Sequence, residues 1–289
     1  MDNSEAQPQT FALPTGAPPL LVASDVDGTL ITSKERITAR LRQVLVRMTR
    51  AGTVLSLSTG RPPRWLFPVL EQLHVRPVCV CANGAIVYDS ATDAMVSVAA
   101  LQPAALQRIA HAAARALHAH GGVGLAVERA GSSAFDPVDQ LFVAAPGYAH
   151  TWAGGPYGQE PVAELLAQPA IKLLLRNHTL SAREMYALVA PQVPAQLGHI
   201  TYSVDDGLLE VAAPGVTKAA GVAQLAELIG ASAADVVCFG DMPNDSEMLR
   251  WAGLGVAMGN GHPEVKNAAD AVTTSNDDYG VARVLETWF

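Results

Sequence analysis

The chain has 289 residues, of which 49% are hydrophobic and 16% charged, and its formal net charge is -8 at pH 7. This composition excludes a disordered chain, because enough apolar side chains are present to offset the entropy lost on folding, and the acidic balance argues against a general nucleic-acid binder. No apolar run approaches the roughly 20 residues of a membrane-spanning helix, and residues 1–18 do not have the basic and apolar segments of a signal peptide. We therefore expect a cytoplasmic protein of about two domains, with a flexible tail at 1–18 and neither a membrane nor a nucleic acid as partner.

Strands and helices alternate in the first part of the chain. The predicted elements are a buried strand ending at Asp25, a helix over 36–51, a strand over 53–61, a helix from about Pro62 to residue 73, and a strand in 77–89 with a turn at Asn83-Gly84. This spacing is typical of right-handed βαβ units on a parallel sheet. We therefore expect an α/β fold with a Rossmann-like, doubly wound core, in which these three strands share one sheet.

The middle of the chain shows a different pattern. The predicted elements are an alanine-rich helix over 101–120, short strands within 121–160, a strand over 170–176, a helix over 181–193, and a hairpin within 199–213. This mixture predicts a second, α+β unit with an antiparallel sheet. Its aromatic residues could form a small core or a wall on which a sugar stacks; they are Phe135, Phe142, Tyr148, Trp152 and Tyr157.

The alternating pattern then resumes. The predicted elements are a helix over 217–230, a strand ending at Asp241, a helix over 244–253, a strand within 254–260, a short helix over 262–270, a short strand over 269–274 and a terminal helix over 280–289. The simplest layout is a core domain made of residues 19–88 and 212–289. An inserted domain then occupies residues 89–211.

The chain has three cysteines. Cys79 and Cys81 lie two residues apart in an apolar stretch, so they would share one face of a strand. We interpret both as small core residues, because a metal pair would need further ligands nearby. This cysteine usage favours the cytoplasm.

Reactive residues follow several predicted strands of the core. The segments are DVDGT (25–29), STGR (58–61), ANGA (82–85) and FGDMPND (239–245). In open α/β sheets, ligands bind outside the carboxyl ends of the strands. We therefore expect the functional site where these four segments converge.

Asp25 and Asp27 carry the chemistry of the first segment. If the strand persists, both side chains point to one side while Val26 faces the core. Two carboxylates that lie so near each other repel, and they need a cation or a shared proton between them. Asp241 would complete a set of oxygen ligands suited to Mg²⁺. One carboxylate can then act as a nucleophile while the other moves a proton. The alternative is an Asx-type turn after a buried strand.

Four motifs in order resemble those of the haloacid dehalogenase-like phosphatases: DVDGTL (25–30), STGR (58–61), GVTK (215–218) and GDMPND (240–245). Their spacing, with ANGA (82–85), AMGN (257–260) and NDDYGVARVLE (276–286), is similar to the Cof-type sugar-phosphatase branch, which carries a large cap between the second and third motifs. The resemblance implies that the inserted α+β domain is this cap. It implies a Mg²⁺-dependent phosphatase acting on a small phosphorylated metabolite, with a sugar phosphate as the expected class. A sugar-phosphate mutase on the same fold is the alternative, and a non-enzymatic phospho-receiver or metal-binding scaffold fits the length and the motifs less well.

The same resemblance assigns roles to individual residues. Asp25 would attack phosphorus and form an aspartyl-phosphate, and Asp27 would protonate the leaving oxygen and then activate water. Thr59 would hydrogen-bond the phosphoryl group, and Lys218 would neutralise its charge and hold Asp25. Asp241 would bind Mg²⁺ together with the carboxylate of Asp25 and the main-chain carbonyl of Asp27.

Five further residues belong to the expected site. Asn244 would orient the substrate phosphate, and Asp245 would orient Lys218 or the groups around the metal. Arg61, which follows Gly60 in the second motif, could contact phosphate or form a surface salt bridge. Asn83 could approach the substrate or simply form a turn. We place Gly60, Arg61, Asn83 and Asn244 with the phosphate-binding residues.

Overall fold

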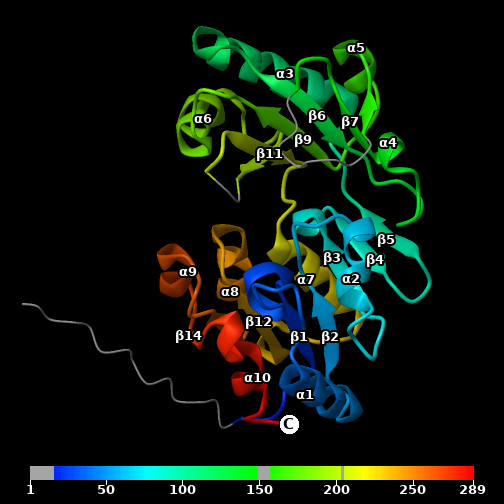
Figure 1. Ribbon diagram of the computed structural model, residues 1–289, viewed down its shortest axis with the longest axis vertical. Coiled ribbons are helices and arrows are strands. Elements are labelled where there is room, and N and C mark those ends of the chain that lie inside the picture. The colour runs from blue at the N-terminus through cyan, green and yellow to red at the C-terminus, as the bar shows by residue number, and fades with distance from the viewer. Residues whose placement is uncertain (1–15, 149–156, 203–204) are drawn as a thin grey trace, which may run out of the picture.

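The computed structural model describes residues 16–148, 157–202 and 205–289, and it shows two α/β parts that lie one above the other in Figure 1. The lower part is built on a parallel sheet and the upper part on a mostly antiparallel one. The expected α/β class with a parallel-sheet core is therefore confirmed. Among the described residues, no helix combines the length and the apolar character needed to cross a membrane.

The core sheet has five parallel strands in the order β14-β13-β12-β1-β2. Their bounds are β1 Leu21–Ser24, β2 Val54–Leu57, β12 Val236–Gly240, β13 Leu254–Ala257 and β14 Ala271–Val272. The helices around them are α1 Ala39–Arg50, α7 Lys218–Leu228, α8 Ser246–Trp251, α9 Pro263–Ala268 and α10 Gly280–Leu285. The predicted elements of this part are thus present, with the first strand ending one residue earlier than expected.

Both faces of this sheet are buried, which explains the continuous apolar runs of its strands. In β1, Val22 belongs to the hydrophobic cluster that contains residues of α1 and α10, such as Val44 and Val281. Its neighbour Leu21 belongs to the cluster on the other side, which contains Val222 of α7. Helices on both faces leave only the ends of the strands open to a ligand.

The expectation that residues 77–89 form a third strand of the parallel sheet is wrong. β3 Val78–Cys81 pairs antiparallel with β4 Ile86–Asp89, which pairs antiparallel with β5 Ala94–Val98. A turn with Asn83 at φ +58° and Gly84 at φ +99° reverses the chain after β3. β3 nevertheless lies beside β2: Ser58, just after β2, forms a parallel bridge with Val80, and the hydroxyl of Ser56 donates to the main-chain carbonyl of Val78 at 2.8 Å. The predicted helix after β2 is short and interrupted, with turns at Pro63–Trp65 and Phe67–Leu70 (α2).

The upper part has a six-stranded sheet in the order β10-β11-β9-β6-β7-β8. The bounds are β6 Gly124–Glu128, β7 Phe142–Ala144, β8 Gly158–Gln159, β9 Lys172–Arg176, β10 His199–Thr201 and β11 Leu208–Ala212. The helices are α3 Pro103–Leu117, α4 Val138–Leu141, α5 Val162–Leu165 and α6 Ala182–Val189. The antiparallel prediction is confirmed for every pair except β7 with β8, which is parallel.

The predicted aromatic cluster of this part divides into two. Phe142 makes edge contacts with Tyr148 and Tyr157 and packs among apolar residues, as expected for a small core. Phe135 is 71% exposed, and its ring lies 4.5 Å from that of Phe67 in the lower part. Trp152 lies outside the described residues.

The domain division stays a proposal. β4 and β5 pair across residue 89, so a boundary there would cut a hairpin. We propose to move the first boundary to the end of β5 at Val98, and to keep the second near residue 212, where β11 ends. Residues 1–15 of the predicted tail lie outside the described residues.

The three cysteines are buried in the hydrophobic clusters. Burial raises the pKa of the Cys79 thiol to about 12 and that of Cys81 well above its usual value. Among the described residues, neither belongs to a group of side chains that could hold a metal ion. The interpretation of both as core residues is confirmed.

Candidate active site

A cavity of about 460 Å³ lies at the carboxyl ends of the core strands. It is bordered by nine of the ten residues expected at the site, although they come from five separate stretches of the chain. These are Asp25, Asp27, Thr59, Gly60, Arg61, Asn83, Lys218, Asp241 and Asn244. The tenth, Asp245, is fully buried and bonded to Lys218 at this cavity.

The chain leaves β1 in a tight turn over residues 26–30. Gly28 has φ +72°, and a Cβ atom there would lie 2.3 Å from Oδ2 of Asp241. Only glycine therefore fits, because both the backbone conformation and the close approach of Asp241 exclude a side chain. The turn keeps Asp25 at the end of the strand and brings the loop after β12 against it.

Lys218 is the buried cation of the site. It begins α7 after Thr217, whose hydroxyl caps the helix by accepting the N–H of Ala220. Its Nζ donates to Oδ1 of Asp25 at 2.6 Å and to Oδ1 of Asp245 at 2.7 Å. Burial disfavours the ammonium charge, but these two carboxylates outweigh it and hold the pKa of Lys218 above its usual value. Lys218 is therefore positively charged at neutral pH.

Asp245 holds the loop that carries Asp241. Its Oδ2 accepts the main-chain N–H groups of Asp241 and Met242 at 2.9 and 3.0 Å, while its Oδ1 accepts from Lys218. The carboxylate thus uses both oxygens within the protein. This is the arrangement expected of a residue that positions its neighbours.

Asp25, Asp241 and Asp245 form an acidic cluster that fits a divalent cation. One oxygen from each lies within 4.8 Å of the others. Burial, with the negative charges of the neighbouring carboxylates, raises the pKa of Asp25 well above its usual value and that of Asp241 to about 6, against the opposing effects of Lys218 and Thr29. Because Lys218 offsets only part of this charge, a further cation would stabilise the cluster, and oxygen ligands suit Mg²⁺.

Asp27 borders the same cavity as Asp25, and Val26 between them is buried in the core, but Asp27 is not among the three carboxylates that lie close enough to hold a metal ion. Its carboxylate instead accepts two hydrogen bonds from Arg61, at 2.8 and 2.5 Å. Arg61 also donates to the main-chain carbonyl of Trp65. The guanidinium therefore holds Asp27 at the edge of the cavity, and it forms the salt bridge that the sequence left as one of two alternatives.

Thr59 has a hydroxyl available for a ligand. Its Oγ1 accepts the main-chain N–H of Arg61 at 3.1 Å. The structure shows no acceptor for its hydroxyl proton among the described residues. The residue is 1% exposed, so the hydroxyl is held at the cavity wall.

Two side chains of the upper part reach this site, and the sequence analysis missed both. Lys172 of β9 donates to the main-chain carbonyl of Gly60 at 3.1 Å and pairs with Glu210 of β11 at 3.0 Å. Asn83 also donates to Glu210, at 3.2 Å. Each could have been found as the single charged residue in an otherwise apolar strand, IKLLL (171–175) and LLEVA (208–212). A charge buried in such a strand needs a partner, so it indicates a specific polar contact.

A buried ion pair also connects the two parts away from the cavity. Arg64, in the turn before α2, pairs with Glu128 of β6, and both side chains are almost fully buried. Burial raises the pKa of Glu128, while Arg64 opposes that shift. Together with Lys172 and Glu210, this pair holds the upper part over the ends of the core strands.

Comparison with known proteins places these features in a family context. The family model described as haloacid dehalogenase-like hydrolase matches residues 22–285. A 5-amino-6-(5-phospho-D-ribitylamino)uracil phosphatase of Bacillus subtilis is 25% identical over 271 residues, covering 94% of this chain and 98% of that protein. A pyridoxal phosphate phosphatase of Escherichia coli is 28% identical over 288 residues, covering 92% and 97%. A solved phosphatase structure from Bacteroides thetaiotaomicron has the same fold, with a TM-score of 0.77 at 18% identity and coverage of 96% and 98%.

Proposed function

The chain belongs to the haloacid dehalogenase-like hydrolases, and on this basis we propose that it is a Mg²⁺-dependent phosphatase that releases inorganic phosphate from a small phosphorylated metabolite through an aspartyl-phosphate at Asp25. The observation that carries the proposal is the arrangement of Lys218 between Asp25 and Asp245, with Asp241 beside them at the strand ends. Phosphoryl transfer needs mainly positioning and positive charge, and this cluster supplies both.

In the first step, Asp25 attacks phosphorus, so that an O–P bond to the enzyme forms while the ester P–O bond breaks. Lys218 favours the ionised, nucleophilic form of Asp25 and offsets the charge of the phosphoryl oxygens. The hydroxyl of Thr59 donates to one of those oxygens. Asp27, after taking up a proton from solvent and giving up one of its hydrogen bonds from Arg61, passes that proton to the leaving oxygen.

In the second step, a water molecule attacks the same phosphorus atom and passes its proton to Asp27. Inorganic phosphate leaves, and the carboxylate of Asp25 is restored. A Mg²⁺ ion held by Asp25 and Asp241, and by the main-chain carbonyl of Asp27 that the family resemblance adds, would stabilise the negative charge of the transferring group. The cap above the site would exclude other water during the first step.

The direct test is hydrolysis of p-nitrophenyl phosphate by the purified protein. We expect release of inorganic phosphate with Mg²⁺, almost complete loss of activity with EDTA, and recovery when Mg²⁺ is added back. ³¹P NMR with hexose phosphates distinguishes the alternative, because a mutase would interconvert isomers without releasing phosphate. Activity that survives removal of all divalent cations would contradict the metal-dependent mechanism.

The contact between Arg61 and Asp27 leads to a further prediction. If Arg61 positions Asp27 as the proton donor, Arg61→Ala should lower kcat by about 10-fold or more for an alkyl phosphate, since general acid catalysis contributes roughly 10²-fold to 10⁴-fold. The loss for p-nitrophenyl phosphate should be smaller, because nitrophenolate leaves without a proton. Arg61→Lys should retain part of the alkyl-phosphate activity. Equal losses on both substrates with a raised KM would show instead that Arg61 contacts the phosphate.

A further inference from the structure

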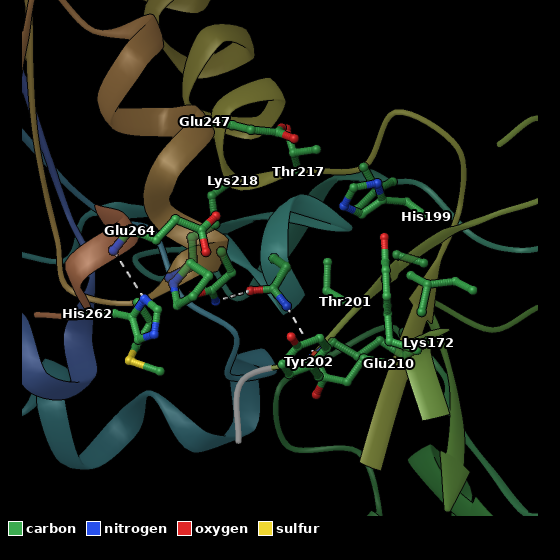
Figure 2. A pocket seen from close by; sticks show the side chains of 18 of the residues that line it. Lys172, His199, Thr201, Tyr202, Glu210, Thr217, Lys218, Glu247, His262 and Glu264 are labelled. Carbon is green, nitrogen blue, oxygen red and sulfur yellow. Dashed lines mark hydrogen bonds and ion pairs between the residues drawn. The ribbon is translucent and has the colours of Figure 1, made fainter. Parts of the chain in front are cut away.

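The loop after β13, residues 258–262, contacts both segments that carry acidic residues of the site. A second cavity, of about 430 Å³, opens beside the first, and Figure 2 shows His262, the last residue of this loop, on its core side. The main-chain N–H of His262 donates to the carbonyl of Asp241 at 2.8 Å, and that of Met258 donates to the carbonyl of Gly240 at 3.0 Å. The loop is therefore fixed to the end of β12, where Asp241 lies.

Asn260, in the same loop, connects it to the turn over residues 26–30. Its Nδ2 group donates to the main-chain carbonyl of Gly28 at 2.8 Å, and its Oδ1 atom accepts the main-chain N–H of Asn276 at 3.0 Å. A carbonyl can only accept and an amide N–H can only donate, so these two partners fix the orientation of the Asn260 side chain. The side chain of Asn276 in turn donates to the carbonyl of Ile31 at 2.9 Å. Two asparagines from the last part of the chain thus hold the turn at residues 28 and 31.

The turn needs such support because it contains a glycine. Asp27 has φ −77° and ψ 127°, and Gly28 has φ 72° and ψ −1°; these are the angles of a type II β-turn. Glycine adopts other conformations at little cost. In a type I turn the peptide between Asp27 and Gly28 would be reversed, so that the carbonyl of Asp27 would point the opposite way. The bond from Asn260 holds the peptide on the other side of Gly28 and therefore opposes this change.

Two functional groups of the site depend on the conformation of this turn. On one side of Gly28, Asp27 lies at the edge of the first cavity and is paired with Arg61. On the other side, the hydroxyl of Thr29 donates to Oδ1 of Asp241 at 2.8 Å, and Asp241 belongs to the acidic cluster. A turn that changed its conformation would displace the carboxyl group of Asp27 and remove a hydrogen bond from Asp241. Proton transfer and cation binding would then both be impaired.

We propose that Asn260 is a positioning residue that holds the turn after β1 in the conformation needed for proton transfer by Asp27 and for cation binding at the acidic cluster. This inference rests on the proposed function of both. Asn260 borders neither cavity, so it acts through the carbonyl of Gly28 and not by contact with a substrate. Asn260 is exposed, and water can replace its hydrogen bond, so its removal should change the melting temperature little.

The test compares Asn260→Ala with the wild-type protein in two measurements. The first is the affinity for Mn²⁺, used as a probe of the Mg²⁺ site and measured by electron paramagnetic resonance without substrate. We expect its dissociation constant to rise by about 10-fold, the scale on which loss of a group that orients metal ligands acts. The second is the ratio of kcat for p-nitrophenyl phosphate to kcat for an alkyl phosphate that the wild-type protein hydrolyses, such as a hexose 6-phosphate or glycerol 1-phosphate. This ratio should rise by about 3-fold or more, because only the alkyl leaving group needs the proton of Asp27.

Two further variants separate the bond to Gly28 from general effects. Asn260→Asp keeps an acceptor for Asn276 but has no donor for Gly28, so the kcat ratio should rise as it does in Asn260→Ala. Asn267→Ala removes an exposed asparagine of α9 that borders neither cavity, and it should leave the Mn²⁺ affinity and the kcat ratio unchanged.

The possible outcomes distinguish this inference from the proposed function. An unchanged Mn²⁺ affinity in Asn260→Ala, or a wild-type kcat ratio in either variant of Asn260, would overturn the positioning role. A lower melting temperature with equal losses on the two substrates would assign Asn260 a structural role only. Wild-type protein without any Mg²⁺-dependent hydrolysis of p-nitrophenyl phosphate would refute the proposed function itself.

Discussion

Replacing Asp25 by asparagine is expected to lower kcat for p-nitrophenyl phosphate by about 10⁴-fold or more, the scale on which loss of a catalytic nucleophile is measured. The amide keeps the size and planar shape of the carboxylate but is not a nucleophile and cannot form the aspartyl-phosphate. It also removes one negative charge from the cluster around Lys218 and Asp241, so the affinity for Mg²⁺ should fall as well. The measurement is initial-rate kinetics at saturating Mg²⁺.

The matched control is Asp139→Asn, an exposed position on α4 that borders neither cavity. It should keep the kinetics of the wild-type protein. Circular dichroism should show that both variants are folded, because asparagine at position 25 relieves repulsion between buried carboxylates. If Asp25→Asn keeps more than about a tenth of the activity, where loss of a nucleophile costs orders of magnitude more, Asp25 is not the nucleophile.

Replacing Lys218 by methionine is expected to have the second-largest effect. Loss of one preorganised charge at a reacting group costs roughly 10²-fold to 10³-fold in kcat, and Lys218 is the cation that touches Asp25. The same change leaves Asp25 and Asp245 buried without their ion-pair partner, and breaking a buried pair typically costs about 3–5 kcal/mol of stability. We therefore expect a lower melting temperature together with slower turnover.

The two effects can be separated. Activity is measured at a temperature at which circular dichroism shows the variant to be folded, and excess Mg²⁺ compensates for weaker metal binding. Lys34→Met, which removes an exposed lysine outside both cavities, is the control and should change neither quantity. A destabilised variant with the wild-type kcat would assign Lys218 a structural role only.

The functional segments of the core were predictable because their signals are local. An apolar run that ends in DVDGT predicts a buried strand with acidic residues at its carboxyl end, and the observed β1 ends one residue before Asp25. The same reasoning applies to β12 and Asp241. Since the carboxyl ends of parallel strands lie at one edge of a sheet, a correct order of strands and helices was enough to bring these residues together.

The prediction for residues 77–89 was wrong because two local signals in the sequence disagreed. The apolar run Val78–Cys81 is compatible with a parallel or an antiparallel sheet, because its residues do not indicate the direction of the strand it pairs with. The Asn83-Gly84 pair is a known hairpin signal, but the alternation of strands and helices around it favoured a parallel strand. The observed pairing with β4 and β5 joins strands that follow one another along the chain, so the hairpin signal was the correct one of the two.

By itself, the sequence determined the α/β class, the inserted unit and the acidic and basic residues at the strand ends, because each depends on periodicity or on neighbours along the chain. Only the tertiary structure decided that Asp27 pairs with Arg61, that Lys172 and Glu210 of the upper part reach the site, and that Asn244 donates to Asn83. These contacts join residues between 34 and 161 positions apart. The contacts of Lys172 and Glu210 depend on how the upper part packs on the lower part, and the other two depend on how the loops of the lower part meet; patterns local in the sequence predict neither.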